Sequence, residues 1–147
     1  MEVFFNELFD YNFFCNKQLI EECLKLKEVS ERSRKLFSHI LNAHRIWNAR
    51  LIGNPEEPKA WEEHPVEKWA EIHYENQRNT FEIITNTDDF EERVDYENIE
   101  KRLFINTKQD MLFHIINHST HHRAQILMDF REQGIDPIAL DYVFYKR

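Results

Sequence analysis

A twelve-residue stretch late in the chain concentrates the side chains best suited to bind a metal ion. His114 to Gln125 holds half of the eight histidines, and no Gly or Pro interrupts it. Apolar residues recur before and after it, so we expect one helix. On a helix, His118 and His122 lie one turn apart, about 40° off alignment. Two imidazoles at this spacing can point at one ion without bending the backbone. The alternative is a helix with histidines on its surface.

A third histidine on a second helix would complete such a site. We expect that helix from Glu31 to Ile52, with Ser30 as its N-cap and Gly53 as its stop. Its inward-facing residues are Phe37, Leu41, His44, Asn48 and Leu51. His39 lies about 140° around the helix from His44, so the two cannot share a face, and we expect His44 to be the ligand. A hydrogen-bonded core histidine is the other interpretation of His44, and the third ligand would then be sought among His114, His121 and His73.

The composition is that of one soluble domain spanning residues 1–147. The net charge is −8, and no basic stripe is found, which argues against general binding of nucleic acids or acidic membranes. The first residues show no charged segment followed by an apolar run, so we expect no signal peptide or membrane span. Cys15 and Cys23 are too far apart along one helix for a disulfide. We therefore expect reduced thiols and a cytoplasmic location.

The remaining segments predict an all-α protein with a small β-hairpin. Low contents of Gly and Pro favour long helices, and the apolar spacing predicts three more of them: Val3 to Lys27, Pro65 to Thr85, and a helix that begins after the capping sequence Thr107-x-x-Asp110 and ends at Gly134. A Pro-bearing loop, Asn54 to His64, carries Trp61, which could shield a site or simply fill a gap in the packing. Strand-like residues predict a hairpin between the third and fourth helices, with strands at Glu92–Tyr96 and Arg102–Asn106. A tail from Ile138 to Arg147 should pack back on the helices.

Two motifs and the tail resemble a known family. They are Leu41-Asn42-Ala43-His44-Arg45-Ile46-Trp47-Asn48-Ala49-Arg50-Leu51, Asn117-His118-Ser119-Thr120-His121-His122-Arg123-Ala124-Gln125-Ile126, and Gly134-Ile135-Asp136-Pro137 followed by Asp141-Tyr142. Over essentially the whole chain they are similar to the damage-inducible DinB/YfiT-like superfamily. The resemblance implies an up-down-down-up four-helix bundle and a divalent metal held by His44, His118 and His122. It also implies a homodimer, for which the phenylalanines of the first helix supply a wide apolar face.

Three neutral imidazoles would leave one position of a tetrahedral ion open, as in catalytic zinc sites. Zinc is the expected metal, although nickel or iron would also accept such ligands. The sequence singles out no further catalytic residue, and three functions remain open. The first, suggested by relatives, is a thiol-dependent S-transferase whose small-molecule partner is a low-molecular-weight thiol. The second is a metal-dependent hydrolase. The third is a non-catalytic stress-response or binding protein with a structural metal.

Overall fold

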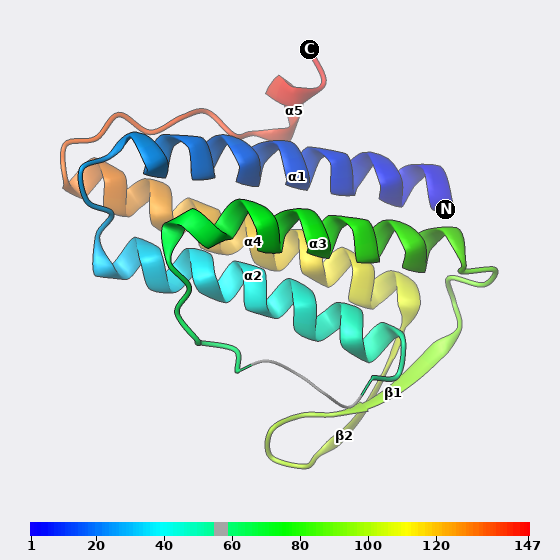
Figure 1. Ribbon diagram of the computed structural model, residues 1–147. Helices are drawn as coiled ribbons and strands as arrows, with labels where there is room; N and C mark the ends of the chain where they lie inside the picture. Colours follow the sequence, from blue (N-terminus) through cyan, green and yellow to red (C-terminus); the bar gives the residue numbers. More distant parts are fainter. Residues whose placement is uncertain (55–58) are drawn as a thin grey trace.

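The chain is mostly helical, with one small antiparallel hairpin. The structure is a computed structural model that describes residues 1–54 and 59–147, so part of the loop expected at Asn54 to His64 lies outside the described residues. Within that described part there are five helices and two strands (Figure 1): α1 Glu2–Lys25, α2 Glu31–Leu51, α3 Val66–Thr85, β1 Arg93–Glu97, β2 Leu103–Thr107, α4 Lys108–Glu132 and α5 Tyr142–Tyr145.

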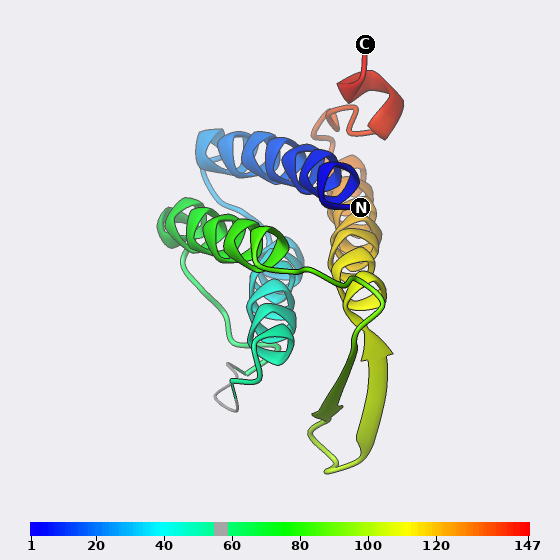
Figure 2. The ribbon, with the colours of Figure 1, turned by 90° about the vertical axis from the view of Figure 1, so that its right-hand side faces the viewer.

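The four long helices lie alongside one another. α1 and α4 run in one direction and α2 and α3 in the other (Figure 1). Seen nearly along their axes, they surround a shared interior, and the hairpin extends away from it (Figure 2). α2 packs on both α3 and α4, while α1 packs on both α3 and α4. The arrangement therefore brings the histidine-bearing helix α4 against α2. None of the described helices combines the length and apolar character that a membrane crossing needs.

Local sequence signals set the helix ends. The Ser30 hydroxyl accepts a hydrogen bond from the Ser33 amide at the start of α2. Thr107 and Asp110 form a reciprocal capping box at the start of α4. Gly53 and Gly134, which follow α2 and α4, adopt positive φ angles of 69° and 73°. Such angles carry little steric cost for glycine, which explains why the two helices stop there. The predicted caps are thus confirmed.

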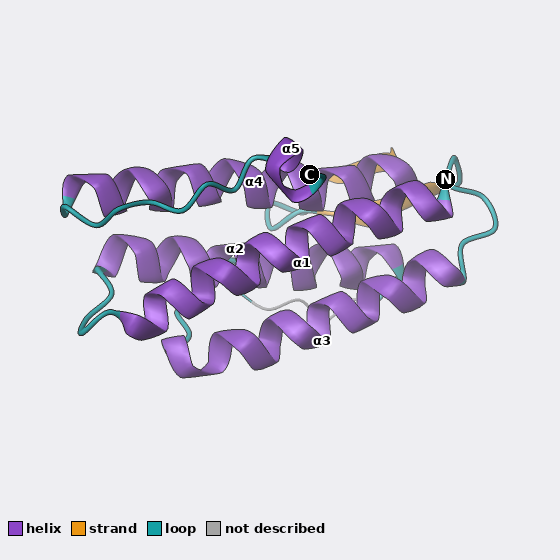
Figure 3. Cartoon of the chain, turned by 90° about the horizontal axis from the view of Figure 1, so that it is seen from above, coloured by secondary structure: helices purple, strands orange, loops and turns teal. Residues whose placement is uncertain are grey.

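The predicted hairpin is confirmed with each strand shifted by one residue. β1 and β2 pair antiparallel, with Tyr96 opposite Phe104. The tail contains a short helix, α5, that the sequence did not predict. Seen from above, the segment leading to α5 runs back along α4 (Figure 3). The Tyr11 hydroxyl of α1 donates a 2.8 Å hydrogen bond to the Leu140 carbonyl, which fastens the tail to α1.

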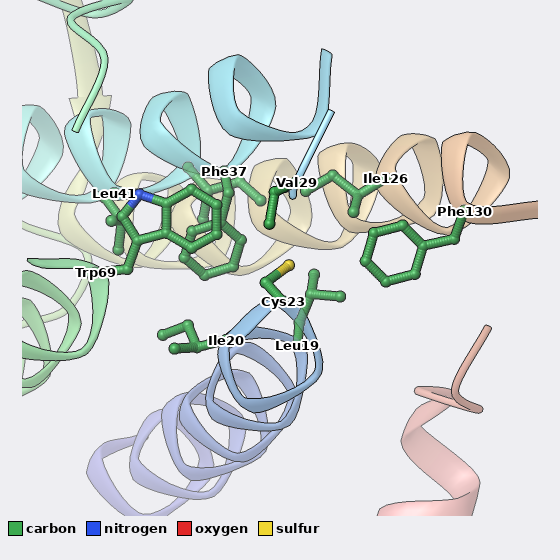
Figure 4. Close-up of a cluster of buried hydrophobic side chains, with 10 residues drawn as sticks. Leu19, Ile20, Cys23, Val29, Phe37, Leu41, Trp69, Ile126 and Phe130 are labelled. Carbon is green, nitrogen blue, oxygen red and sulfur yellow. The ribbon is translucent and has the colours of Figure 1, made fainter. Parts of the chain in front are cut away.

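The apolar interior consists of two clusters separated by a polar layer. One cluster joins the end of α1 to the starts of α2 and α3 and the end of α4, with Trp69 stacked on Phe37 (Figure 4). The other joins the start of α1 to the ends of α2 and α3 and the start of α4. Between them, at the middle of the helices, lie buried polar side chains: Asn12, Asn16, His44, Asn48, His73, Asn76, Thr80, Ser119 and Arg123. The candidate site lies at this middle level of α4.

A buried carboxylate joins α2 to α4. Asp129, near the end of α4, is 6% exposed and accepts hydrogen bonds from the hydroxyls of Ser30 and Ser33 and from the Gln133 side chain. Ser30 is also the N-cap of α2, so the same carboxylate lies at the helix start, where a negative charge is favourable. This contact fixes the register of α2 against α4, which the site requires.

We predict that truncating Leu19 lowers stability far more than truncating Leu24 on the same helix. Leu19 is fully buried in the first cluster, whereas Leu24 is 53% exposed. Leu19→Ala should lower the free energy of unfolding by about 2–5 kcal/mol, because it removes apolar contacts and leaves a cavity. Leu24→Ala should change it by less than about 0.5 kcal/mol. Urea unfolding measures both, and equal effects would contradict the packing described.

Candidate metal centre

Three histidines from two helices direct ring nitrogens to one place. His118 Nε2 lies 3.1 Å from His39 Nε2 and 3.1 Å from His122 Nε2. All three nitrogens lie within 4.8 Å of one another. Zinc–imidazole bonds of about 2.0–2.1 Å place two ligand nitrogens about 3.3 Å apart around a tetrahedral ion. The described residues therefore contain a group of histidines that could hold a divalent metal.

The local structure of each helix supplies the spacing. His118 and His122 are one turn apart on α4, and their ring centroids are 4.4 Å apart. His39 comes from α2, which packs directly on α4. Its ring meets the other two edge-on, at centroid distances of 4.9 Å. One ion at this point would be bound by both helices at once.

In His39 and His122, the outer ring nitrogen, Nδ1, has a hydrogen-bond partner outside the group. The inner nitrogen, Nε2, is therefore left as an acceptor. His39 Nδ1 lies 2.7 Å from the Ala60 carbonyl oxygen, which can only accept a hydrogen bond. Nδ1 must then carry the proton, and Nε2 carries the lone pair. His122 Nδ1 lies 2.7 Å from Gln125 Oε1 in the same way. Such outer contacts orient metal-binding histidines and raise their basicity.

Without a cation, the three inner nitrogens cannot satisfy one another. If Nε2 of His39 and of His122 each carry a lone pair, His118 Nε2 can donate one proton to only one of them. The other Nε2 then receives no hydrogen bond from the group. Leaving a buried acceptor unpaired costs on the order of 1–3 kcal/mol. A cation bound at this point would satisfy all three nitrogens.

Burial keeps these imidazoles in the form that binds metal. Burial, together with the neighbouring histidines, lowers the pKa of His118 to about 3. Burial also lowers the pKa values of His39 and His122 below their usual range. All three side chains are therefore neutral near pH 7, which is the state that a metal requires of histidine.

Other aromatic and histidine side chains surround this group. The Trp61 ring stacks on His39, with centroids 3.7 Å apart and planes 2° apart. His121 lies next to His122 and His114 next to His118, at centroid distances of 5.0 and 5.5 Å. Neither of these two belongs to the group of converging nitrogens. In the part of the chain that the structure describes, that group contains histidines only.

Comparison with protein families places the whole chain in one family. The family model described as "DinB family" matches residues 1–147. The chain belongs to the DinB family. No curated protein matches the sequence, so the family match carries this identification.

In this DinB-family protein, His44 lies apart from the converging histidines. Its Nε2 is 2.7 Å from the Thr80 hydroxyl of α3, and its ring lies 5.7 Å from that of Phe9 of α1. His44 therefore faces α1 and α3, whereas His39 faces α4. His118 and His122 lie together as predicted, but the third member is His39 and not His44. Whether they bind a metal stays a prediction.

The expectation that His44 is the third ligand assumes that α2 has a single buried face. The residues from Phe37 to His44 are all buried, because α2 packs on α3, on α4 and on the loop before α3. His39, Ala43 and Ile46 follow the i, i+4, i+7 spacing and mark a second buried face. This spacing is the feature of the sequence that could have indicated that His39 is buried on a second face. The remaining candidate, His73, is also buried apart from the group and stacks on Phe13.

We predict that the ligand set can be separated from the core histidine by mutation. His39→Ala, His118→Ala and His122→Ala should each abolish stoichiometric divalent metal, since each removes one converging nitrogen. His44→Ala should retain one metal per chain while lowering the melting temperature, because His44 is 3% exposed and hydrogen-bonded. Elemental analysis of the purified variants measures this. Metal retained by His39→Ala but lost from His44→Ala would contradict the geometry.

We also predict that His44 contributes to acid sensitivity. Burial lowers its pKa to about 3, whereas in the unfolded chain it titrates near its reference value of about 6.5. Between these values the unfolded state binds the extra proton, so stability falls as the pH decreases from about 6.5 to about 3. His44→Gln keeps a hydrogen-bonding side chain but does not titrate. Its free energy of unfolding should therefore depend less steeply on pH than that of the wild type, and identical slopes in urea unfolding would refute this.

Proposed function

We propose that this DinB-family protein is a metal-dependent enzyme that activates a low-molecular-weight thiol for S-transfer. His39, His118 and His122 hold the divalent metal, with zinc as the first choice and nickel or iron as alternatives. The observation that carries the proposal is the convergence of three Nε2 atoms with contacts of 3.1 Å. Membership of the DinB family agrees with it.

The chemistry of the ligand set can accommodate a thiol. Three neutral imidazoles do not reduce the charge of a divalent ion, and they leave its fourth position open. When bound, such an ion supplies a Lewis acid that favours the deprotonated, nucleophilic form of a thiol. The protein's own residues orient the ligands: the Ala60 carbonyl holds His39, and Gln125 holds His122.

A hydrolase is the alternative that a carboxylate beside the site would favour, because hydrolysis uses a general base. Among residues 1–54 and 59–147, the group of possible ligands consists of histidines, so no carboxylate in that group could act as such a base. We place the thiol reaction first as our own choice between the two, and the experiment below decides it. A purely structural metal is the third possibility, and the experiment below separates it from the others.

We propose three further properties of the whole protein. The directions of α1 to α4 support an up-down-down-up four-helix bundle as its topology (Figure 1). Phe4 and Phe14 of α1, which are 52% and 41% exposed, support a homodimer formed through this helix. The two cysteines are free and buried, which supports a cytoplasmic location.

Titration of the Co²⁺-loaded protein with a small thiol tests the proposed reaction class. We expect 2-mercaptoethanol to produce a sulfur-to-cobalt charge-transfer absorption that saturates at one thiol per metal. Ethylene glycol, which replaces the sulfur by oxygen, is the matched control and should produce none.

Two other outcomes would contradict the thiol function. A Co²⁺ protein that ignores thiols but hydrolyses an activated ester in a metal-dependent reaction would be a hydrolase. A Co²⁺ spectrum that responds to neither thiol nor ester would indicate a structural metal.

A further inference from the structure

An exposed tryptophan lies flat against one of the candidate ligands. The ring centroids of Trp61 and His39 are 3.7 Å apart, and their planes differ by 2°. Trp61 also meets His122 edge-on, at 6.3 Å and 81°. Its side chain is nevertheless 58% exposed, so it is not part of the apolar core. An indole that remains exposed while covering a ligand ring suggests a role at the site.

The residue before Trp61 holds the same imidazole by a hydrogen bond. The Ala60 carbonyl accepts from His39 Nδ1 at 2.7 Å and from Asn42 Nδ2 at 3.4 Å. Asn42 Nδ2 also donates to the Glu62 carbonyl at 2.7 Å, and Asn42 Oδ1 lies 2.6 Å from His64 Nε2. Asn42 is one turn from His39 on α2. The Asn42 side chain thus fixes the Ala60 carbonyl, and this carbonyl orients His39.

Further contacts fasten this segment independently of the indole. The His64 amide donates to the Ser38 hydroxyl at 3.0 Å. The Trp69 indole nitrogen donates to the His64 carbonyl at 3.0 Å. Arg34 and Glu63 form an ion pair at 2.8 Å. Replacing the Trp61 ring should therefore leave the backbone of the segment in place.

We propose that Trp61 is a positioning residue of the metal centre and acts through His39. A hydrogen bond at Nδ1 fixes one point of the imidazole but lets the ring pivot about it. The stacked indole fixes the plane of the ring, and Nε2 then points at His118 and His122. The indole also excludes water from that side of His39. This inference rests on the proposed function, because it assumes that His39 binds the metal.

Metal affinity distinguishes this role from simple packing. We expect Trp61→Ala to weaken Zn²⁺ binding by about 10–100-fold, the usual effect of removing a residue that orients a metal ligand. Trp61→Phe retains a planar ring and should restore affinity close to that of the wild type. Tyr74→Ala, at an α3 position that is 62% exposed, is the matched control and should have no effect. Competition with a chromophoric chelator measures these affinities.

The visible spectrum of the Co²⁺ protein and the melting temperature of the metal-free protein complete the test. Trp61→Ala should change the ligand-field bands, because the His39 ring is less fixed, and should leave the metal-free melting temperature unchanged. Unchanged affinity and spectrum would overturn the proposal, and so would an equivalent loss of stability in the metal-free protein. A wild type that binds no metal would instead overturn the proposed function itself, together with this inference.

Discussion

Three imidazole Nε2 atoms meet between α2 and α4, and the rest of the structure makes this meeting possible. His118 Nε2 cannot donate to both of its neighbours, and one cation at this point would satisfy all three nitrogens. The spacing on α4, the register of α2 and the loop before α3 all contribute to this arrangement. Asp129 fixes that register by binding the first turn of α2, and Ala60 fixes the proton of His39 on the outer nitrogen.

The interior behind the site is polar. Arg123, next to His122 on α4, is 2% exposed and donates to neutral oxygens of Asn12, Asn16 and Ser119. Burying a charge is costly unless its hydrogen bonds are made. These bonds tie α1 to α4 at the level of the site. The polar layer therefore holds the helix that carries two of the three histidines, while the two apolar clusters stabilise its ends.

The sequence predicted the features that depend on local rules. The capping box of Thr107 and Asp110 defined the start of α4, and helical spacing placed His118 beside His122. The third histidine depends on how helices pack, which spacing within one helix does not determine. Both His39 and His44 are buried, and only the contacts of α2 with α3 and α4 decide which face each one meets. The sequence raised a shielding role for Trp61 but could not name its partner, because the stacking of Trp61 on His39 joins segments 22 positions apart that no local pattern relates.

A crystal structure of the metal-loaded protein, with anomalous diffraction recorded at the metal absorption edge, tests the central claim most directly. The account predicts one anomalous peak per chain, about 2.0–2.1 Å from Nε2 of His39, His118 and His122. The remaining position should be occupied by water or a small ligand. A peak bound by His44 or His73, or a site closed by a fourth protein ligand, would contradict it.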